Sequence, residues 1–186
     1  MKFFEFKSFY IVTDIKEHKQ NKSTLLRYID EMPPSTVDRQ PFDESVSKTD
    51  WNLPSSYKRN YLDTFYDMMK PYLGEMALKL KCKQWNVLNT WYQVYEKGDI
   101  HGWHIHGRVN YTNVYYLSLP NKSIRTQLYD VVNDKIIENI EVKEGQLLTF
   151  AASVLHRSPI NKVPQKKVII SFNTDFTQPT IKTKDM

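Results

Sequence analysis

The sequence has a single cysteine and no long hydrophobic run. Cys82 is the only cysteine among 186 residues, which excludes an intramolecular disulfide and fits a reducing compartment. No stretch approaches the roughly 20 apolar residues that cross a bilayer, and residues 1–7 are too charged for the apolar segment of a signal peptide. We therefore expect a cytoplasmic protein that has no membrane partner.

The chain also lacks a cluster of like charges. The formal net charge is +5, but the basic residues are dispersed and form no block beyond Lys166-Lys167. A lysine-rich solvated surface explains this pattern, so a nucleic-acid partner is not expected. No internal repeat or low-complexity tract is visible. The length favours a single domain over residues 1–186.

Aromatic residues are abundant, with twelve Tyr, nine Phe and four Trp, and they favour pleated β structure. Residues 1–54 predict an N-terminal strand (2–13) and a turn-rich loop region (14–50). Residues 55–81 show helical spacing of apolar side chains, with Ser55 or Ser56 as N-cap and Pro71 as the point of a kink or split.

From residue 87 onward the pattern changes to short strands separated by turn signals. Strands are expected over residues 89–96, 103–108, 111–119, 125–131, 136–142, 146–151 and 166–174. The predicted fold is mainly β with flanking helices: a jelly-roll core over 87–176, with the 55–81 helices packed outside it. Residues 177–186 are expected to form a frayed tail.

Four of the five histidines lie in two separated stretches. His101, His104 and His106 fall within six residues, and His156 follows some fifty residues later. Alternation along a strand places His104 and His106 on one face, where two imidazoles can bind the same ion. A strand that ends near His156 can deliver a third. The pattern predicts a transition-metal site at His104, His106 and His156, against the alternative of hydrogen-bonding surface histidines.

The motifs around these histidines resemble those of the 2-oxoglutarate/Fe(II)-dependent dioxygenases. The resemblance rests on residues 91–99 (WYQVYEKGD), 103–106 (WHIH), 114–117 (VYYL) and the series Gly145, Phe150, His156 and 167–173 (KVIISFN). It is closest to a small phage and bacterial family related to the prolyl hydroxylases. It implies a double-stranded β-helix that binds Fe(II) through His104, His106 and His156. The family at large has Asp or Glu where this chain has His106, which leaves Asp99 and His101 as other candidates for the third ligand.

The resemblance also implies a site for 2-oxoglutarate. Lys167 would pair with its distal carboxylate, and Ser171, which shares a strand face with Lys167, would add a hydrogen bond. Tyr116 occupies the position of a further donor, and Tyr95 is a candidate at the other end of the co-substrate. Strand parity leaves Tyr115 as the alternative to Tyr116. Without the resemblance, Lys167 reads as a solvent-facing strand lysine.

The implied activity is an oxygenase that uses Fe(II), 2-oxoglutarate and O2, with ascorbate as a reductant, to hydroxylate an unidentified substrate. Kinship with prolyl hydroxylases suggests a protein side chain. Arg108 and Arg157 stand beside the histidines and can meet an anionic substrate. Two alternatives stay open: a cupin-type three-His dioxygenase without 2-oxoglutarate, against which residues 110–114 lack the usual Glu, and a non-catalytic jelly-roll binding module.

Overall fold

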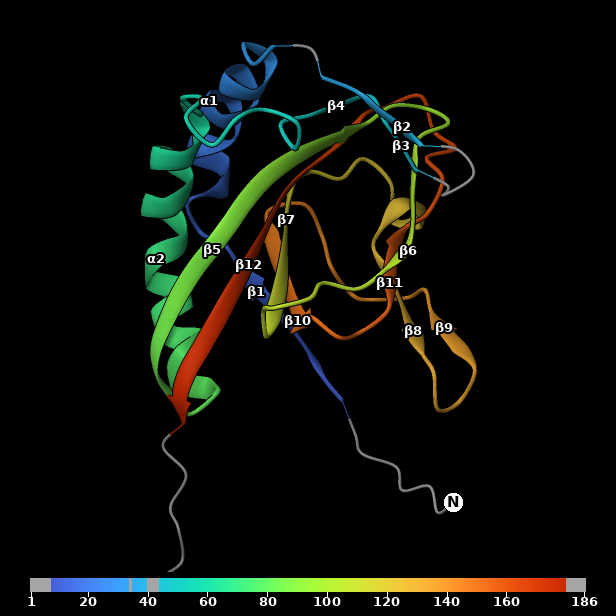
Figure 1. Ribbon diagram of the computed structural model, residues 1–186. Coiled ribbons are helices and arrows are strands. Elements are labelled where there is room, and N and C mark those ends of the chain that lie inside the picture. The colour runs from blue at the N-terminus through green and yellow to red at the C-terminus, as the bar shows by residue number, and fades with distance from the viewer. Residues whose placement is uncertain (1–7, 34, 40–43, 180–186) are drawn as a thin grey trace, which may run out of the picture.

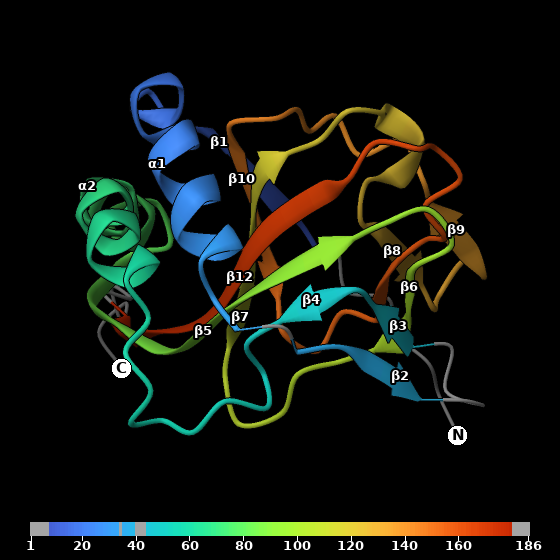
Figure 2. The ribbon, with the colours of Figure 1, turned by 90° about the horizontal axis from the view of Figure 1, so that it is seen from above.

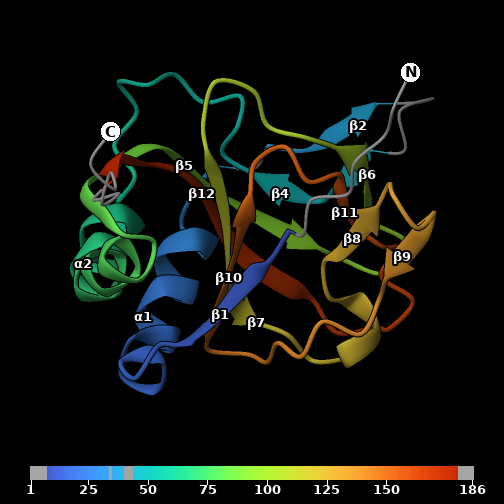
Figure 3. The ribbon, with the colours of Figure 1, turned by 90° about the horizontal axis from the view of Figure 1, so that it is seen from below.

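A computed structural model describes residues 8–33, 35–39 and 44–179. Two antiparallel sheets face each other, and two helices cover the outer face of one of them (Figure 1). The views from above and below show the three layers in order: the helices, the sheet beside them, and the second sheet (Figures 2 and 3). This arrangement confirms the prediction of a mainly β jelly roll with flanking helices.

The sheet that the helices cover is called sheet I, and the other is sheet II. Sheet I has the strand order β1-β10-β7-β12-β5-β4, and sheet II has the order β2-β3-β6-β11-β8-β9. The strands of sheet I are β1 (Tyr10–Asp14), β10 (Gln146–Ala151), β7 (Tyr111–Ser118), β12 (Lys167–Pro179), β5 (Cys82–Tyr95) and β4 (Lys48–Thr49). Those of sheet II are β2 (Val37–Arg39), β3 (Glu44–Val46), β6 (Ile100–His104), β11 (His156–Ser158), β8 (Gln127–Asp130) and β9 (Lys135–Ile137). A 3-10 turn, η1, spans Lys122–Ile124.

Helix α1 (His18–Asp30) lies in a segment where only loops and turns were expected. The prediction of loops over residues 14–50 is wrong here. The helix is largely polar and buries only His18, Leu25 and Ile29, so its sequence has few apolar side chains from which a helix could be predicted. The preceding strand β1 begins at Tyr10, later than the strand expected over 2–13: residues 8 and 9 are not in a strand, and residues 2–7 lie outside the described chain.

Helix α2 (Tyr61–Lys79) begins at N-cap Asn60, so the expectation of Ser55 or Ser56 as N-cap is wrong. It continues through Pro71 without being split. Neither described helix is long and apolar enough to cross a membrane. The buried face of α2 packs on sheet I and consists of Tyr61, Phe65, Met68, Met69, Leu73, Met76 and Ala77.

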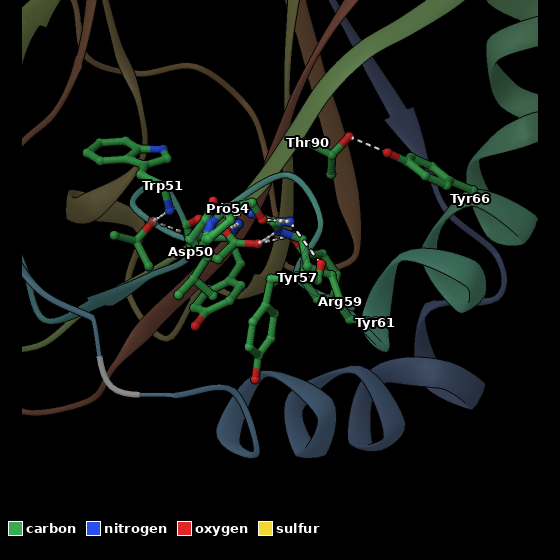
Figure 4. A network of polar contacts seen from close by, with 11 residues as sticks. Asp50, Trp51, Pro54, Tyr57, Arg59, Tyr61, Tyr66 and Thr90 are labelled. Carbon is green, nitrogen blue, oxygen red and sulfur yellow. Dashed lines mark hydrogen bonds and ion pairs between the residues drawn. The ribbon is translucent and has the colours of Figure 1, made fainter.

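A polar network around Asp50 explains why α2 begins late (Figure 4). Arg59 donates to the Asp50 carboxylate at 2.8 Å and to the carbonyl oxygens of Leu53, Pro54 and Tyr57, which holds residues 53–59 in turns. Tyr61, the first residue of α2, donates its hydroxyl to the same carboxylate at 2.8 Å.

The same carboxylate also fixes β5. It accepts the backbone N–H of Tyr92 at 3.0 Å, and Tyr66 on α2 donates to Thr90 at 2.9 Å (Figure 4). The helix start and the middle of β5 are therefore held by the buried bonds of Tyr61 and Tyr92 to Asp50, which are costly to break. Two residues of β5 adjoining Tyr92, namely Trp91 and Gln93, line the candidate site described below.

Several strands differ in length from the prediction. β10 has the expected bounds, whereas β5 begins earlier, at Cys82, and β12 extends to Pro179. Thr177–Pro179 were expected to fray but pair with β5. β6 ends at His104, which leaves His106 in the connection to β7. Strands β1–β4 precede residue 87, where the core was predicted to begin, and yet belong to the two sheets. One hydrophobic cluster lies between sheet I and the helices, and a second lies between the two sheets.

Candidate metal centre

Three histidines converge between the sheets. His104 ends β6 and His156 begins β11, and the two residues are directly paired in sheet II. His106 joins them from the connection after β6. One ring nitrogen of each histidine lies within 4.8 Å of the corresponding nitrogens of the other two. The spacing allows the three rings to bind a single ion, for which nitrogen–metal distances of about 2.0–2.1 Å are usual.

The hydrogen bonds of His104 and His156 determine which nitrogen faces the ion. Nδ1 of His104 bonds the carbonyl oxygen of Gly102 at 2.8 Å, and Nδ1 of His156 bonds that of Val154 at 2.9 Å. A carbonyl oxygen only accepts, so each Nδ1 carries the hydrogen and each Nε2 keeps a free electron pair. Burial lowers the pKa of His104 to about 4 and that of His156 to about 3, so both rings are neutral at pH 7.

His106 is oriented by a side chain of sheet I. Its backbone N–H bonds the oxygen of Ala152 at 3.0 Å, and its Nδ1 bonds Oδ1 of Asn173 at 2.7 Å. The hydroxyl of Thr112 donates to the same Oδ1 at 3.1 Å, so this amide oxygen accepts two hydrogen bonds. His106 therefore also has the Nδ1–H form with Nε2 free. Burial lowers its pKa as well.

His101 is close to the cluster but both of its nitrogens are already bonded. Its ring stacks on that of His104, with 3.9 Å between centroids. Its Nδ1 accepts from Nε2 of Gln93 at 3.2 Å, and its Nε2 lies 3.3 Å from a carboxylate oxygen of Glu44. Burial and the neighbouring histidines lower its pKa to about 2. His101 thus packs behind the ligand set and supports the ring of His104.

Asp99, the other candidate for a third ligand, is used to build a turn. Its carboxylate accepts the backbone N–H groups of Ser47 at 2.9 Å and Glu96 at 2.8 Å, and the hydroxyl of Ser45 at 2.8 Å. Through these hydrogen bonds Asp99 links β3 to the connection between β5 and β6. It does not belong to the group of three histidines.

Lys167 lies in the interior between the sheets, as the predicted register requires. Its side chain is fully buried, and its Nζ donates to Oγ of Ser158 at 2.6 Å and lies 4.8 Å from the ring centre of Tyr95. Burial lowers its pKa to about 7. No carboxylate pairs with it among the described residues. The adjacent Lys166 points outward and pairs with Glu96 at 2.7 Å, so the alternative of a solvent-facing Lys167 is excluded.

Gln93 joins these groups, and the sequence analysis did not single it out. Its Oε1 accepts from Trp91 at 3.2 Å and from Ser171 at 3.3 Å. Its Nε2 donates to the hydroxyl of Tyr95 at 2.6 Å and to His101. The detectable signal was a glutamine at the same strand parity as Trp91 and Tyr95, inside the motif that carried the resemblance.

The two neighbouring tyrosines of β7 face opposite layers. Tyr116 points between the sheets, where its hydroxyl donates to Oγ1 of Thr126 at 2.7 Å and accepts the N–H of Thr126 at 3.1 Å. Tyr115 faces the helices, and its hydroxyl bonds Nδ1 of His18 at 2.7 Å. The structure therefore favours Tyr116 over Tyr115 for an interior role, a choice that strand parity left open. Thr126 reaches the cavity surface, whereas Tyr116 lies behind it.

Comparison with known proteins finds similarity in structure only. No protein-family model and no curated protein matches this sequence. A Burkholderia pseudomallei oxidoreductase of the 2OG-Fe(II) oxygenase family superposes with a TM-score of 0.70 at 9% identity, covering 94% of this chain and 88% of that one. A Pseudomonas putida prolyl-4-hydroxylase gives 0.59 at 12% identity, covering 91% and 93%. The viral collagen prolyl hydroxylase of Paramecium Bursaria Chlorella virus-1, in complex with 2OG, gives 0.59 at 14% identity, covering 91% and 96%.

The chain has the fold of the 2OG-Fe(II) oxygenases. At identities of 9–14% the likeness establishes the fold, so the chemistry of the site must be argued from this chain's own residues. Three neutral imidazoles with free Nε2 atoms are a suitable donor set for a divalent transition metal such as Fe(II). With His106 in place of a carboxylate, the protein ligands leave the charge of the ion uncompensated.

The cavity between the sheets is small. Its volume is about 30 Å³, which is room for about two water molecules. A five-carbon dicarboxylate must therefore displace side chains on entering this oxygenase fold. In the part of the chain that the structure describes, no Asp or Glu lines the cavity; the lining residues are Trp91, Gln93, Tyr95, His101, His104, His106, Thr112, Val114, Thr126, His156, Arg157, Ser158, Ile169 and Ser171.

Proposed function

We propose that this protein is an Fe(II)- and 2-oxoglutarate-dependent oxygenase that hydroxylates a substrate not yet identified. The observation that carries the proposal is the fully buried Lys167, which has no carboxylate partner among the described residues and shares the interior with three convergent histidines. A buried ammonium is costly without a counter-ion. A dicarboxylate that binds the metal at one end and Lys167 at the other supplies one.

In this proposal His104, His106 and His156 hold Fe(II) through Nε2. Lys167 binds the distal carboxylate of 2-oxoglutarate, and its present partner Ser158 is displaced or shared. When bound, Fe(II) and 2-oxoglutarate supply oxidative decarboxylation of the co-substrate coupled to hydroxylation of the substrate by O2, with ascorbate keeping the iron reduced.

The remaining polar residues of the interior orient the co-substrate. Ser171 and Tyr95 are both tied to Gln93 and can turn their hydroxyl groups toward a carboxylate. Tyr116 acts through Thr126, because its own hydroxyl is bonded there. The apolar side chains of Val114 and Ile169 line the same cavity and exclude water from it.

One alternative is favoured by specific observations. A three-His dioxygenase that uses no 2-oxoglutarate fits a cavity of about 30 Å³ whose described lining residues include no carboxylate. It leaves the buried Lys167 without a role, and for that reason we rank it second. Neither function identifies the primary substrate. The prolyl hydroxylases among the similar structures make a protein side chain the first class to test, and the single Cys82 suggests a cytoplasmic setting.

The test is turnover of 2-oxoglutarate without a primary substrate. Purified protein is incubated with Fe(II), ascorbate and 2-oxoglutarate in air, and succinate is measured. In parallel, 2-oxoglutarate binding to the Fe(II) form is titrated under argon. We expect slow succinate formation that is lost in His104→Ala and in Lys167→Ala but kept in Lys166→Ala. Absence of both succinate and binding contradicts the proposal. Metal-dependent O2 uptake without 2-oxoglutarate supports the three-His alternative.

A further inference from the structure

One arginine lines the cavity beside the three histidines. Arg157 follows His156 on β11 and is half-buried. Its Nε donates to Oε1 of the buried Gln127 at 2.7 Å, and its guanidinium lies 4.6 Å from the ring centre of Trp103. Gln127 is on β8 and Trp103 on β6, the two neighbours of β11 in sheet II (Figure 1). The guanidinium is therefore held from both sides and is pre-organised for binding.

The contacts of Arg157 leave its outer edge available. The hydrogen bond to Gln127 uses Nε alone, and the two terminal nitrogens have no hydrogen-bond partner among the described residues. No Asp or Glu forms an ion pair with Arg157 in the described part of the chain. A guanidinium presents its donors as a planar fork that matches the two oxygens of a carboxylate.

The charge of the cavity favours an anion. Among the described residues its lining contains no acid, and the carboxylate of Glu44 contacts His101, one of the lining residues, at 3.3 Å. An Fe(II) ion, Lys167 and Arg157 together carry more positive charge than the two carboxylates of 2-oxoglutarate neutralise. An oxygenase with an Asp or Glu ligand would have less of this excess. In a poorly hydrated site, uncompensated charge of one sign attracts a ligand of the other sign.

From this geometry we propose that the primary substrate carries a carboxylate and that Arg157 binds it at the cavity, so that the reacting carbon lies beside the metal. The inference rests on the proposed function and adds the substrate class. A protein substrate would then present an acidic side chain or a chain terminus, and a small-molecule substrate would be an acid.

Arg108 supplies a matched control. It lies two residues from the metal-binding candidate His106, as Arg157 lies next to His156, but it is exposed and does not line the cavity. Arg108→Gln and Arg157→Gln remove the same charge, each from a position close in sequence to a histidine of the cluster. Only the second removes a donor from the cavity. A general effect of net charge would appear in both variants.

The experiment compares an acid with its neutral isostere. Protein loaded with Ni(II) and 2-oxoglutarate under argon is titrated with phenylacetate, phenylacetamide and phenyl phosphate by calorimetry. We expect phenylacetate to bind at least tenfold tighter than phenylacetamide, about the ratio that one charge-assisted hydrogen bond gives. Arg157→Gln should abolish this preference and leave 2-oxoglutarate affinity within about twofold of wild type. Arg108→Gln should behave as wild type.

Each other outcome overturns the inference. Equal binding of acid and amide by wild type, or a preference that survives in Arg157→Gln, removes Arg157 as the anion site. A preference for phenyl phosphate overturns the assignment of a carboxylate. A large loss of 2-oxoglutarate affinity in Arg157→Gln reassigns the residue to the co-substrate. If wild type binds no 2-oxoglutarate, the proposed function fails, and the same comparison with Ni(II) alone still decides the role of Arg157.

Discussion

His106 and Asn173 are 67 positions apart in the sequence, and Nδ1 of the histidine lies 2.7 Å from the amide oxygen of the asparagine. The bond crosses from the connection after β6 in sheet II to β12 in sheet I. It fixes the ring in the form that presents Nε2 to the other two histidines. Burial lowers the pKa of His106 and keeps the ring neutral, while the amide oxygen of Asn173 sets which nitrogen carries the hydrogen.

Removing this bond should weaken metal binding without unfolding the protein. Asn173→Ala leaves His106 free to rotate and to change tautomer, so we expect a ten- to hundredfold lower affinity for Co(II), the range typical of lost outer-shell partners. The measurement is a titration followed by visible absorption, with thermal unfolding of the metal-free protein as the check on folding. Asn89→Ala is the control, because Asn89 pairs with Asn173 on β5 but is exposed. Equal affinities in the two variants would exclude an orienting role for Asn173.

The identity of the third ligand is tested at His106 itself. His106→Ala should reduce Fe(II) affinity strongly, because it removes one of three protein ligands. His106→Asp should bind Fe(II) at least as well as wild type, since it introduces the charged ligand usual in two-His-one-carboxylate sites. Affinity is measured by competition with a chelator. An unchanged affinity in His106→Ala would show that the ion is bound elsewhere.

The sequence predicted the fold where local patterns agree with it. The β10 strand has the expected bounds. Alternation put Lys166 and Lys167 on opposite faces, and the resemblance chose Lys167 as the interior residue, which is where the structure places it. The first helix was missed because α1 is polar and buries few side chains, so its stability comes from packing on sheet I and α2. The start of α2 was misplaced because it depends on the hydrogen bonds of Arg59, which reach back as far as Asp50, nine positions earlier.

The site was predictable as a set of histidines but not as a network. Motif spacing identified the three histidines that the fold brings together. Their orienting partners are backbone carbonyls and Asn173, which become neighbours only after the sheets pair. The role of Gln93 is likewise tertiary, since its partners include Ser171, 78 positions away. A single sequence carries no signal for such contacts unless a motif includes them.

Replacing Lys167 by an apolar residue should stabilise the protein without its ligand. Burial holds the pKa of Lys167 at about 7 in the folded protein, below the ordinary lysine value of 10.5. Between these values the unfolded chain binds more protons, so this lysine makes stability rise with pH, by up to about 1.4 kcal/mol per unit. Lys167→Met removes that dependence and the cost of the buried amine at pH 7. Denaturant unfolding at pH 7, 8 and 9 measures the effect as the difference in free energy of unfolding between wild type and Lys167→Met. A variant less stable than wild type at pH 7 would contradict the prediction.

Binding of 2-oxoglutarate should be coupled to proton uptake by the same lysine. The free protein holds Lys167 largely neutral above about pH 7, whereas a carboxylate beside it favours the ammonium form. Each bound co-substrate therefore draws a proton from solution at pH 8, and affinity should fall as pH rises above 7, by up to about tenfold per unit. Lys167→Arg stays charged and should lose this pH dependence even where its affinity is lower, because arginine does not titrate in this range. Calorimetry of the Ni(II) form in buffers of different ionisation enthalpy counts the protons directly. A binding enthalpy that is the same in all buffers at pH 8 would mean that Lys167 does not pair with the co-substrate.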